Sequence, residues 1–169
     1  MKITVPLENG YLGDKYTKHA SNQFKNQGFP ICSFPIQLAN VPSNAQSLAI
    51  TLLDDDAILV CGFTYIHWVA ANIDPNVTVI PENASQTQTI KMTLGNNSLP
   101  GRLINVVEPE LAKHYVGPTP PDKTHQYQLT VYALDTTLNL QDGFWLNEFK
   151  QQIKNHILDQ TEQKLPVRA

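Results

Sequence analysis

Residues 125–135 decide the fold, and they read His125-Gln126-Tyr127-Gln128-Leu129-Thr130-Val131-Tyr132-Ala133-Leu134-Asp135. Apolar residues recur here at every second position, and side chains two residues apart lie on the same face of a strand. This period predicts a β-strand with one buried face. The same alternation predicts strands at Ser47–Asp54 and Ile66–Ile73.

Shorter apolar runs predict further strands at Ile3–Leu7, Ser33–Ala39 and Gln88–Leu94. The 12 prolines fall mainly between these runs, where they mark loops rather than interrupt a ladder of hydrogen bonds. The chain has no internal repeat and no linker that would divide it, so we expect a single domain over residues 1–169.

Two segments have helical spacing. Glu108–His114 predicts a short turn of helix in which Pro109 is tolerated near the start. Phe144–Asn155 predicts a longer helix, because its apolar residues Leu146, Phe149 and Ile153 share one face. Either Asp142 or Asn147 could cap its start.

The segment that follows, Ile157–Leu165, fits a helix or a strand, and we favour a strand. Several strands with one substantial helix predict a mainly β fold, a β-sandwich with a C-terminal helix and short peripheral helices.

Composition narrows the function classes. The chain has 169 residues and a net charge of −3 without a basic run, which argues against nucleic acid as a partner. No segment is apolar for long enough to span a bilayer, and the N-terminus lacks the pattern of a signal peptide. We therefore expect a cytoplasmic protein without integral membrane contact, in which Cys32 and Cys61 are reduced.

Polar side chains replace apolar ones at one end of each clear strand. Continuing by twos from Leu52 reaches Asp54 and Asp56, and Asp55 points the other way. In the second strand, Val69, Ala71 and Ile73 share a face, and stepping back from it reaches His67. In the third strand, Leu129, Val131 and Ala133 are preceded in phase by Tyr127 and His125.

A carboxylate or imidazole in line with a core face loses hydration and must find a partner. If the three strand ends converge, these residues can satisfy one another around a cavity, and the carboxylates would raise the pKa of the histidines. Such a cavity could hold a phosphate or a carboxylate through charge-assisted hydrogen bonds.

Two loops lie between the strands and could wall this cavity. Val116–Asp122 contains Thr119, Pro120 and Pro121 and leads into the third strand, and Cys61–Tyr65 precedes the second. Taken singly, an acidic triplet is more often a solvated turn, and a His-Trp pair more often belongs to a core. The matching strand phase is what favours a pocket.

At these positions the chain resembles the phosphatidylethanolamine-binding protein family, also called Raf kinase inhibitor-like proteins, in its bacterial branch. The first shared signature is an acidic turn followed by a His-Trp pair, here Asp54-Asp55-Asp56-Ala57 and His67-Trp68-Val69. The second reads Gly117-Pro118-Thr119-Pro120-Pro121, His125-Gln126-Tyr127 and Tyr132-Ala133-Leu134-Asp135. Ser33-Phe34-Pro35-Ile36 also resembles the early strand of the family.

The resemblance implies a two-sheet antiparallel Greek-key β-sandwich with a pocket for phosphate-like groups. It implies no catalytic activity, no cofactor and no metal, and it allows a homodimer and a protein partner. The residues that we expect to bind ligand are Asp54, Asp56, His67, Thr119, Pro120, Pro121, His125 and Tyr127.

Two positions depart from the family pattern. Asp55 stands where the family usually has proline, and it adds a negative charge near the rim. Gln126 stands where the family usually has arginine, which removes a cation that could brace the loops or attract an anion.

These residues predict a binding protein for a small anion, such as phosphate, a phosphorylated head group or metabolite, or a carboxylate, and its occupancy could regulate a partner. Two alternatives belong to other classes. A metal-dependent hydrolase could use the histidines and aspartates as ligands, although no compact metal motif is present. An interaction protein that regulates a kinase is the third reading.

Overall fold

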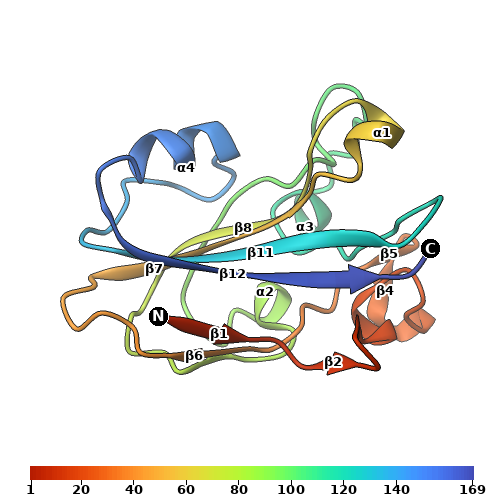
Figure 1. Ribbon diagram of the computed structural model, residues 1–169. Helices are drawn as coiled ribbons and strands as arrows, with labels where there is room; N and C mark the ends of the chain where they lie inside the picture. The colour runs from red at the N-terminus through yellow and green to blue at the C-terminus, as the bar shows by residue number, and fades with distance from the viewer.

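The computed structural model describes residues 1–169, which form mainly antiparallel β-structure (Figure 1). The largest sheet has five strands in the order β10-β8-β7-β11-β12, and each neighbouring pair is antiparallel. Its strands are β7 (Ser47–Asp54), β8 (Tyr65–Ile73), β10 (Thr93–Leu94), β11 (His125–Leu134) and β12 (Ile157–Val167). The three strands with the clearest alternation are confirmed, and so is the choice of a strand after the helix.

A second sheet faces the first and has the order β1-β6-β9. Its strands are β1 (Lys2–Thr4), β6 (Ile36–Ala39) and β9 (Val79–Ile80). Two short ribbons pair β2 (Leu7–Glu8) with β3 (Tyr11–Leu12) and β4 (Lys25–Asn26) with β5 (Phe29–Pro30). The α-helices are α1 (Ile58–Cys61), α2 (Ala84–Thr87), α3 (Pro109–Ala112) and α4 (Leu146–Gln152), and two 3₁₀ turns cover Asp14–Tyr16 and Asn22–Phe24.

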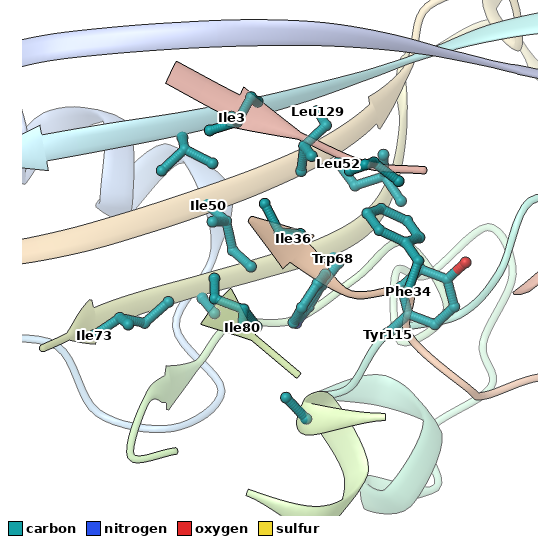
Figure 2. Packing of buried hydrophobic residues seen from close by; sticks show 14 of the residues in the cluster. Ile3, Phe34, Ile36, Ile50, Leu52, Trp68, Ile73, Ile80, Tyr115 and Leu129 are labelled. Atoms are coloured by element: carbon teal, nitrogen blue, oxygen red, sulfur yellow. The ribbon is translucent and has the colours of Figure 1, made fainter. Parts of the chain in front are cut away.

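The main core lies between the two sheets (Figure 2). It is a cluster of 23 buried residues to which both sheets contribute apolar side chains. Alternate residues of β7 and β11 supply one side, and β1, β6 and β9 supply the other: Leu48, Ile50, Leu52, Leu129, Val131 and Ala133 against Ile3, Ile36, Leu38 and Ile80. The core faces predicted for β7 and β11 are therefore confirmed.

The outer face of the five-stranded sheet carries a smaller core under α4, which Figure 1 shows lying across that face. Phe149 and Ile153 pack there against Ala49, Val69 and Ala71. Because this sheet is covered on both sides, β7 is buried along nearly its whole length, which explains why its sequence is so uniformly apolar.

β8 departs from simple alternation at two β-bulges. Its register with β7 passes from Leu52–Trp68 to Leu53–Ile66, so that His67 is an extra residue without an opposite partner. A second shift lies near Asn72, whose φ is 58°. Val69 and Ala71 consequently face the α4 side and Ile73 faces the main core, so the prediction that these three residues share a face is wrong.

The weaker strand predictions are only partly correct. Ile3–Leu7 is interrupted, and Ser33–Ala39 and Gln88–Leu94 form strands only in their last residues, Ile36–Ala39 and Thr93–Leu94. Proline explains two of these differences, since Pro6 and Pro35 cannot donate to a ladder.

The helix predictions hold in position but not in their caps. α3 and α4 lie inside the predicted helical segments, and the helix nearest the C-terminus is followed by β12. The Glu148 carboxylate accepts the Trp145 N–H at the start of α4, at 2.6 Å. Asp142 instead accepts the N–H of Leu94. The prediction of Asp142 or Asn147 as the cap is therefore wrong.

The Greek-key connectivity stays a prediction. No helix of the protein has both the length and the apolar character needed to cross a membrane.

Candidate ligand-binding pocket

A pocket of about 180 Å³ lies where one end of the five-stranded sheet meets α1 and the loop before β11. This end brings together the last residue of β7 and the first residues of β8 and β11, because the strands are antiparallel neighbours. The residues that line it are Asp54, Ala57, Val60, Cys61, Tyr65, His67, Thr119, Pro120, Pro121, His125 and Tyr127. The volume is below the roughly 300–1,000 Å³ of pockets for drug-sized ligands, so it suits a small group.

His125 is held between two carboxylates. Its Nδ1 lies 2.7 Å from Oδ2 of Asp54, and its Nε2 lies 2.9 Å from Oδ1 of Asp122. A carboxylate only accepts hydrogen bonds, so both ring nitrogens carry a proton and the ring is an imidazolium. Burial lowers the pKa of His125, but the hydrogen bonds with Asp54 and Asp122 outweigh burial and raise the pKa above its ordinary value.

His67 is held in the opposite protonation state. Its Nδ1 donates to the carbonyl oxygen of Val116 at 2.7 Å, and the side chain is buried. Burial lowers the pKa of His67 to about 4 against the opposing effects of this hydrogen bond and of Asp54. The ring is therefore neutral near pH 7, and its Nε2, which has no protein partner, presents a lone pair.

The expectation that carboxylates raise the pKa of both histidines is thus correct for His125 and wrong for His67. The difference follows from distance, because Asp54 hydrogen-bonds to His125 directly and acts on His67 only through space. The bulge in β8 keeps His67 on the pocket side even though Val69 and Ala71 face the other way.

Two tyrosines flank His67. The ring centroids of Tyr65 and Tyr127 lie 4.8 and 5.0 Å from that of His67. Burial raises the pKa of Tyr65 to about 12, and burial together with the Asp54 carboxylate raises the pKa of Tyr127 well above its ordinary value. Both hydroxyls therefore keep their protons at neutral pH and can act as donors.

The proline-rich loop is anchored to the N-terminal part of the chain. Lys18 Nζ donates to the carbonyl of Pro120 at 2.6 Å, and the Gly117 N–H donates to Pro30 at 2.8 Å. At Gly117 a Cβ atom would lie only 2.3 Å from the backbone oxygen of Tyr16, so glycine is required for this close approach. Both predicted walls contribute to the pocket, one through residues 119–121 and the other through Cys61 and Tyr65.

Asp56 is the one expected site residue that the structure does not bring to the pocket. Its Oδ2 accepts the backbone N–H of Gln126 at 2.8 Å, which fastens the acidic turn to the start of β11. Asp55 is exposed and accepts a hydrogen bond from Thr64 Oγ1. Asp54 accepts the N–H of Ala57 in addition to its bond with His125, so its carboxylate is fixed from two sides.

Sequence reasoning missed Ala57 and Val60 as lining residues, and it missed the contact of Asp122 with His125. Tyr65 was expected only as part of the wall Cys61–Tyr65, although it lies two residues before His67 at the same strand end. Asp122 gives no signal, since an aspartate in a proline-rich loop is ordinary.

No group of three or more His, Cys, Asp or Glu side chains is arranged so that it could hold a metal ion. The structure therefore offers no ligand set for the alternative of a metal-dependent hydrolase.

Together, the fold and the pocket define a β protein of two antiparallel sheets with a small cavity at the strand ends, lined in part by two histidines and an aspartate and walled by a proline-rich loop. The chain belongs to the phosphatidylethanolamine-binding protein family, whose model matches residues 2–167. The resemblance to this family in the two sequence signatures is therefore confirmed.

Relatives and solved structures agree with this assignment. An uncharacterised protein of Bacillus subtilis, YxkA, is 50% identical over 161 residues, which is 95% of this chain and 96% of that protein. A crystal structure of a phosphatidylethanolamine-binding protein homologue from Chlamydia trachomatis superimposes with a TM-score of 0.75 at 25% identity, covering 94% of this chain and 90% of that one. Escherichia coli YbcL, described as a member of the mammalian family, shows the same fold with a TM-score of 0.77 at 20% identity, covering 99% and 98%.

Proposed function

We propose that this protein is a non-enzymatic binding protein whose pocket takes a small protonated oxyanion, with a phosphate monoester as the best match. The observation that carries the proposal is the pairing of a charged and a neutral imidazole in one small pocket. His125 offers a positive charge, and the Nε2 lone pair of His67 offers an acceptor.

A phosphate monoester carries both kinds of oxygen in its monoanionic form, which makes up half of the population at its second pKa of about 6. Its charged oxygens would accept hydrogen bonds from His125 and from the Tyr127 hydroxyl. Its P–OH group would donate to Nε2 of His67. Asp54 would hold His125 in place through Nδ1, and the stiff backbone of Pro120 and Pro121 would form the wall opposite α1.

Calorimetric titration with inorganic phosphate and with phosphoethanolamine tests the proposal. We expect His125→Ala to lose binding at least tenfold, because the pocket has no lysine or arginine in its lining to replace the imidazolium. His156→Ala is the matched control, since His156 is exposed and pairs only with Asp135.

His125→Ala leaves the carboxylate of Asp54 without its partner and could unfold the protein. Thermal unfolding is therefore the check that this variant is folded. Tyr127→Phe provides a milder second variant that removes one hydroxyl and keeps the ring, and it should weaken binding severalfold. Equal phosphate affinity in the wild type and in both pocket variants would contradict the proposal.

The proposal extends to cellular context. Family membership supports a Raf kinase inhibitor-like role, in which the protein with a filled pocket and the protein with an empty pocket have different affinities for a protein partner. It also supports a cytoplasmic location, in which both cysteines stay free. A homodimer is a further expectation. A pull-down from cell extract with and without added phosphate tests the regulatory part, and an unchanged set of partners would contradict it.

A further inference from the structure

Asp122 takes one of the two hydrogen-bond donors that His125, a lining residue of the pocket, could give to an anion. The ring of His125 has two N–H groups, and both are used inside the protein, one by Asp54 and one by Asp122. An incoming anion can reach a donor of His125 only when one of these carboxylates leaves.

The two carboxylates differ in how readily they can leave. The side chain of Asp54 is 3% exposed and is also bonded to the N–H of Ala57, so its departure would leave two buried donors without a partner. The side chain of Asp122 is 49% exposed and lies in the loop, where water can solvate it after it moves away. Asp122 is therefore the exchangeable partner of His125.

We propose that Asp122 acts as an internal competitor for the ligand and thereby lowers the affinity of the pocket for anions. This inference rests on the proposed function and deepens it. A carboxylate ligand that displaces Asp122 exchanges one carboxylate for another at Nε2 of His125 and gains little. A phosphate monoester also meets His67 and Tyr127 with its remaining oxygens, so it gains contacts that Asp122 does not make.

The cost of displacing Asp122 is the same for every anion that binds His125, so an anion binds well only when it makes further contacts in the pocket. No lysine or arginine lines the pocket, so His125 is the charged donor for which ligand and Asp122 compete. Asp122 does not itself contact the bound ligand, and its effect is exerted through His125.

The test is a calorimetric titration of the whole chain with phosphate and with acetate at pH 6, where the hydrogen bond with Asp54 keeps His125 protonated. We expect Asp122→Ala to bind both anions at least tenfold more tightly than the wild type and by a similar factor, because the cost of displacing Asp122 is common to both. Asp122→Asn keeps a neutral acceptor at the same position and should give an intermediate gain.

Asp55→Ala is the matched control, because it also removes one negative charge from an exposed position near the rim but makes no contact with His125. Equal gains for Asp55→Ala and Asp122→Ala would reduce the effect to net charge and overturn the inference. Phosphate binding by the wild type without any gain in Asp122→Ala would also overturn it, while leaving the proposed function intact. Failure of every variant to bind phosphate would remove the proposed function, and the inference with it.

Discussion

At the scale of single residues, the surroundings of each imidazole decide what it can offer a ligand. His67 bonds to a neutral carbonyl, so burial dominates its titration and the ring stays neutral. His125 is just as deeply placed, but it meets two carboxylates at hydrogen-bond distance and stays charged. Two residues of the same type therefore act as an acceptor and a donor in one pocket.

The neutral state of His67 predicts how stability depends on pH. Its pKa in the folded protein, about 4, is lower than the roughly 6.5 of an unfolded chain, so the unfolded state binds the proton more readily. This difference has no effect on stability above about pH 6.5, and it destabilises the folded protein progressively as the pH falls toward 4. At pH 4.5 the loss should be about 2.5 kcal/mol.

Urea unfolding of the wild type and of His67→Gln at pH 7 and pH 4.5 measures this contribution. Glutamine keeps a donor for the carbonyl of Val116 but does not titrate, so the variant should lose less stability than the wild type over the same interval. His156→Gln should behave like the wild type, because His156 is exposed. A His67→Gln variant as sensitive to acid as the wild type would show that His67 does not resist protonation.

At the scale of elements, β8 shows where sequence periodicity stops being informative. Alternation located β7, β8 and β11 correctly because each is long and faces an apolar layer. It could not reveal the extra residue at His67, since a bulge changes the phase without changing the composition. His67 nevertheless lines the pocket, because the bulge keeps it on the side of Asp54 and Tyr127.

Elements of two residues were largely beyond the reach of the sequence: β9 was not predicted, and β10 is only the end of the predicted strand Gln88–Leu94. β9 and β10 have no room for a period, and they form because neighbouring strands offer them a free edge. The contact of Asp122 with His125 could not be predicted from the sequence either, because it depends on the path of the loop and not on a residue pattern.

The close approach of Gly117 to Tyr16 leads to a prediction about the proline-rich loop. Replacing Gly117 by alanine would place a Cβ atom 2.3 Å from the backbone oxygen of Tyr16, so the loop must move away from the N-terminal segment. We expect a loss of about 2 kcal/mol in unfolding free energy, as is usual for overpacking. Because Pro120 and Pro121 would move with the loop, phosphate binding should weaken as well.

Gly101→Ala is a suitable control for this experiment, since its added Cβ would come no closer than 3.1 Å to the backbone oxygen of Ser98. Its loss of stability should be smaller, and phosphate binding should be unchanged. If Gly117→Ala unfolded at the same urea concentration as Gly101→Ala, the close approach to Tyr16 would not be a real constraint.

At the scale of the whole molecule, the N-terminal segment joins the two sheets along one side. β1 belongs to the three-stranded sheet, and β12 is the outer strand of the five-stranded sheet (Figure 1). The terminal amine of Met1 pairs with Asp159 of β12. Further along, the Gln163 side chain accepts the N–H of Val5 at 2.8 Å and donates to the carbonyl of Val5 at 3.0 Å.

Removing this pair of hydrogen bonds between Gln163 and Val5 should therefore weaken the attachment between the sheets and leave the pocket unchanged. Val5 is only 2% exposed, so Gln163→Ala leaves a buried N–H and a buried carbonyl without partners, and we expect a loss of about 2 kcal/mol. For a chain of this length, that corresponds to a decrease in Tm of about 6 °C.

Glu162→Ala is the control, because Glu162 is the neighbouring exposed residue of β12. It should leave Tm nearly unchanged, which separates the loss of the hydrogen bonds from the general effect of shortening a side chain in β12. Phosphate affinity should stay at the wild-type value in both variants, because no residue of β12 lines the pocket. A Gln163→Ala variant that melts together with Glu162→Ala would mean that packing between the sheets, and not this bond, holds the N-terminal segment against β12.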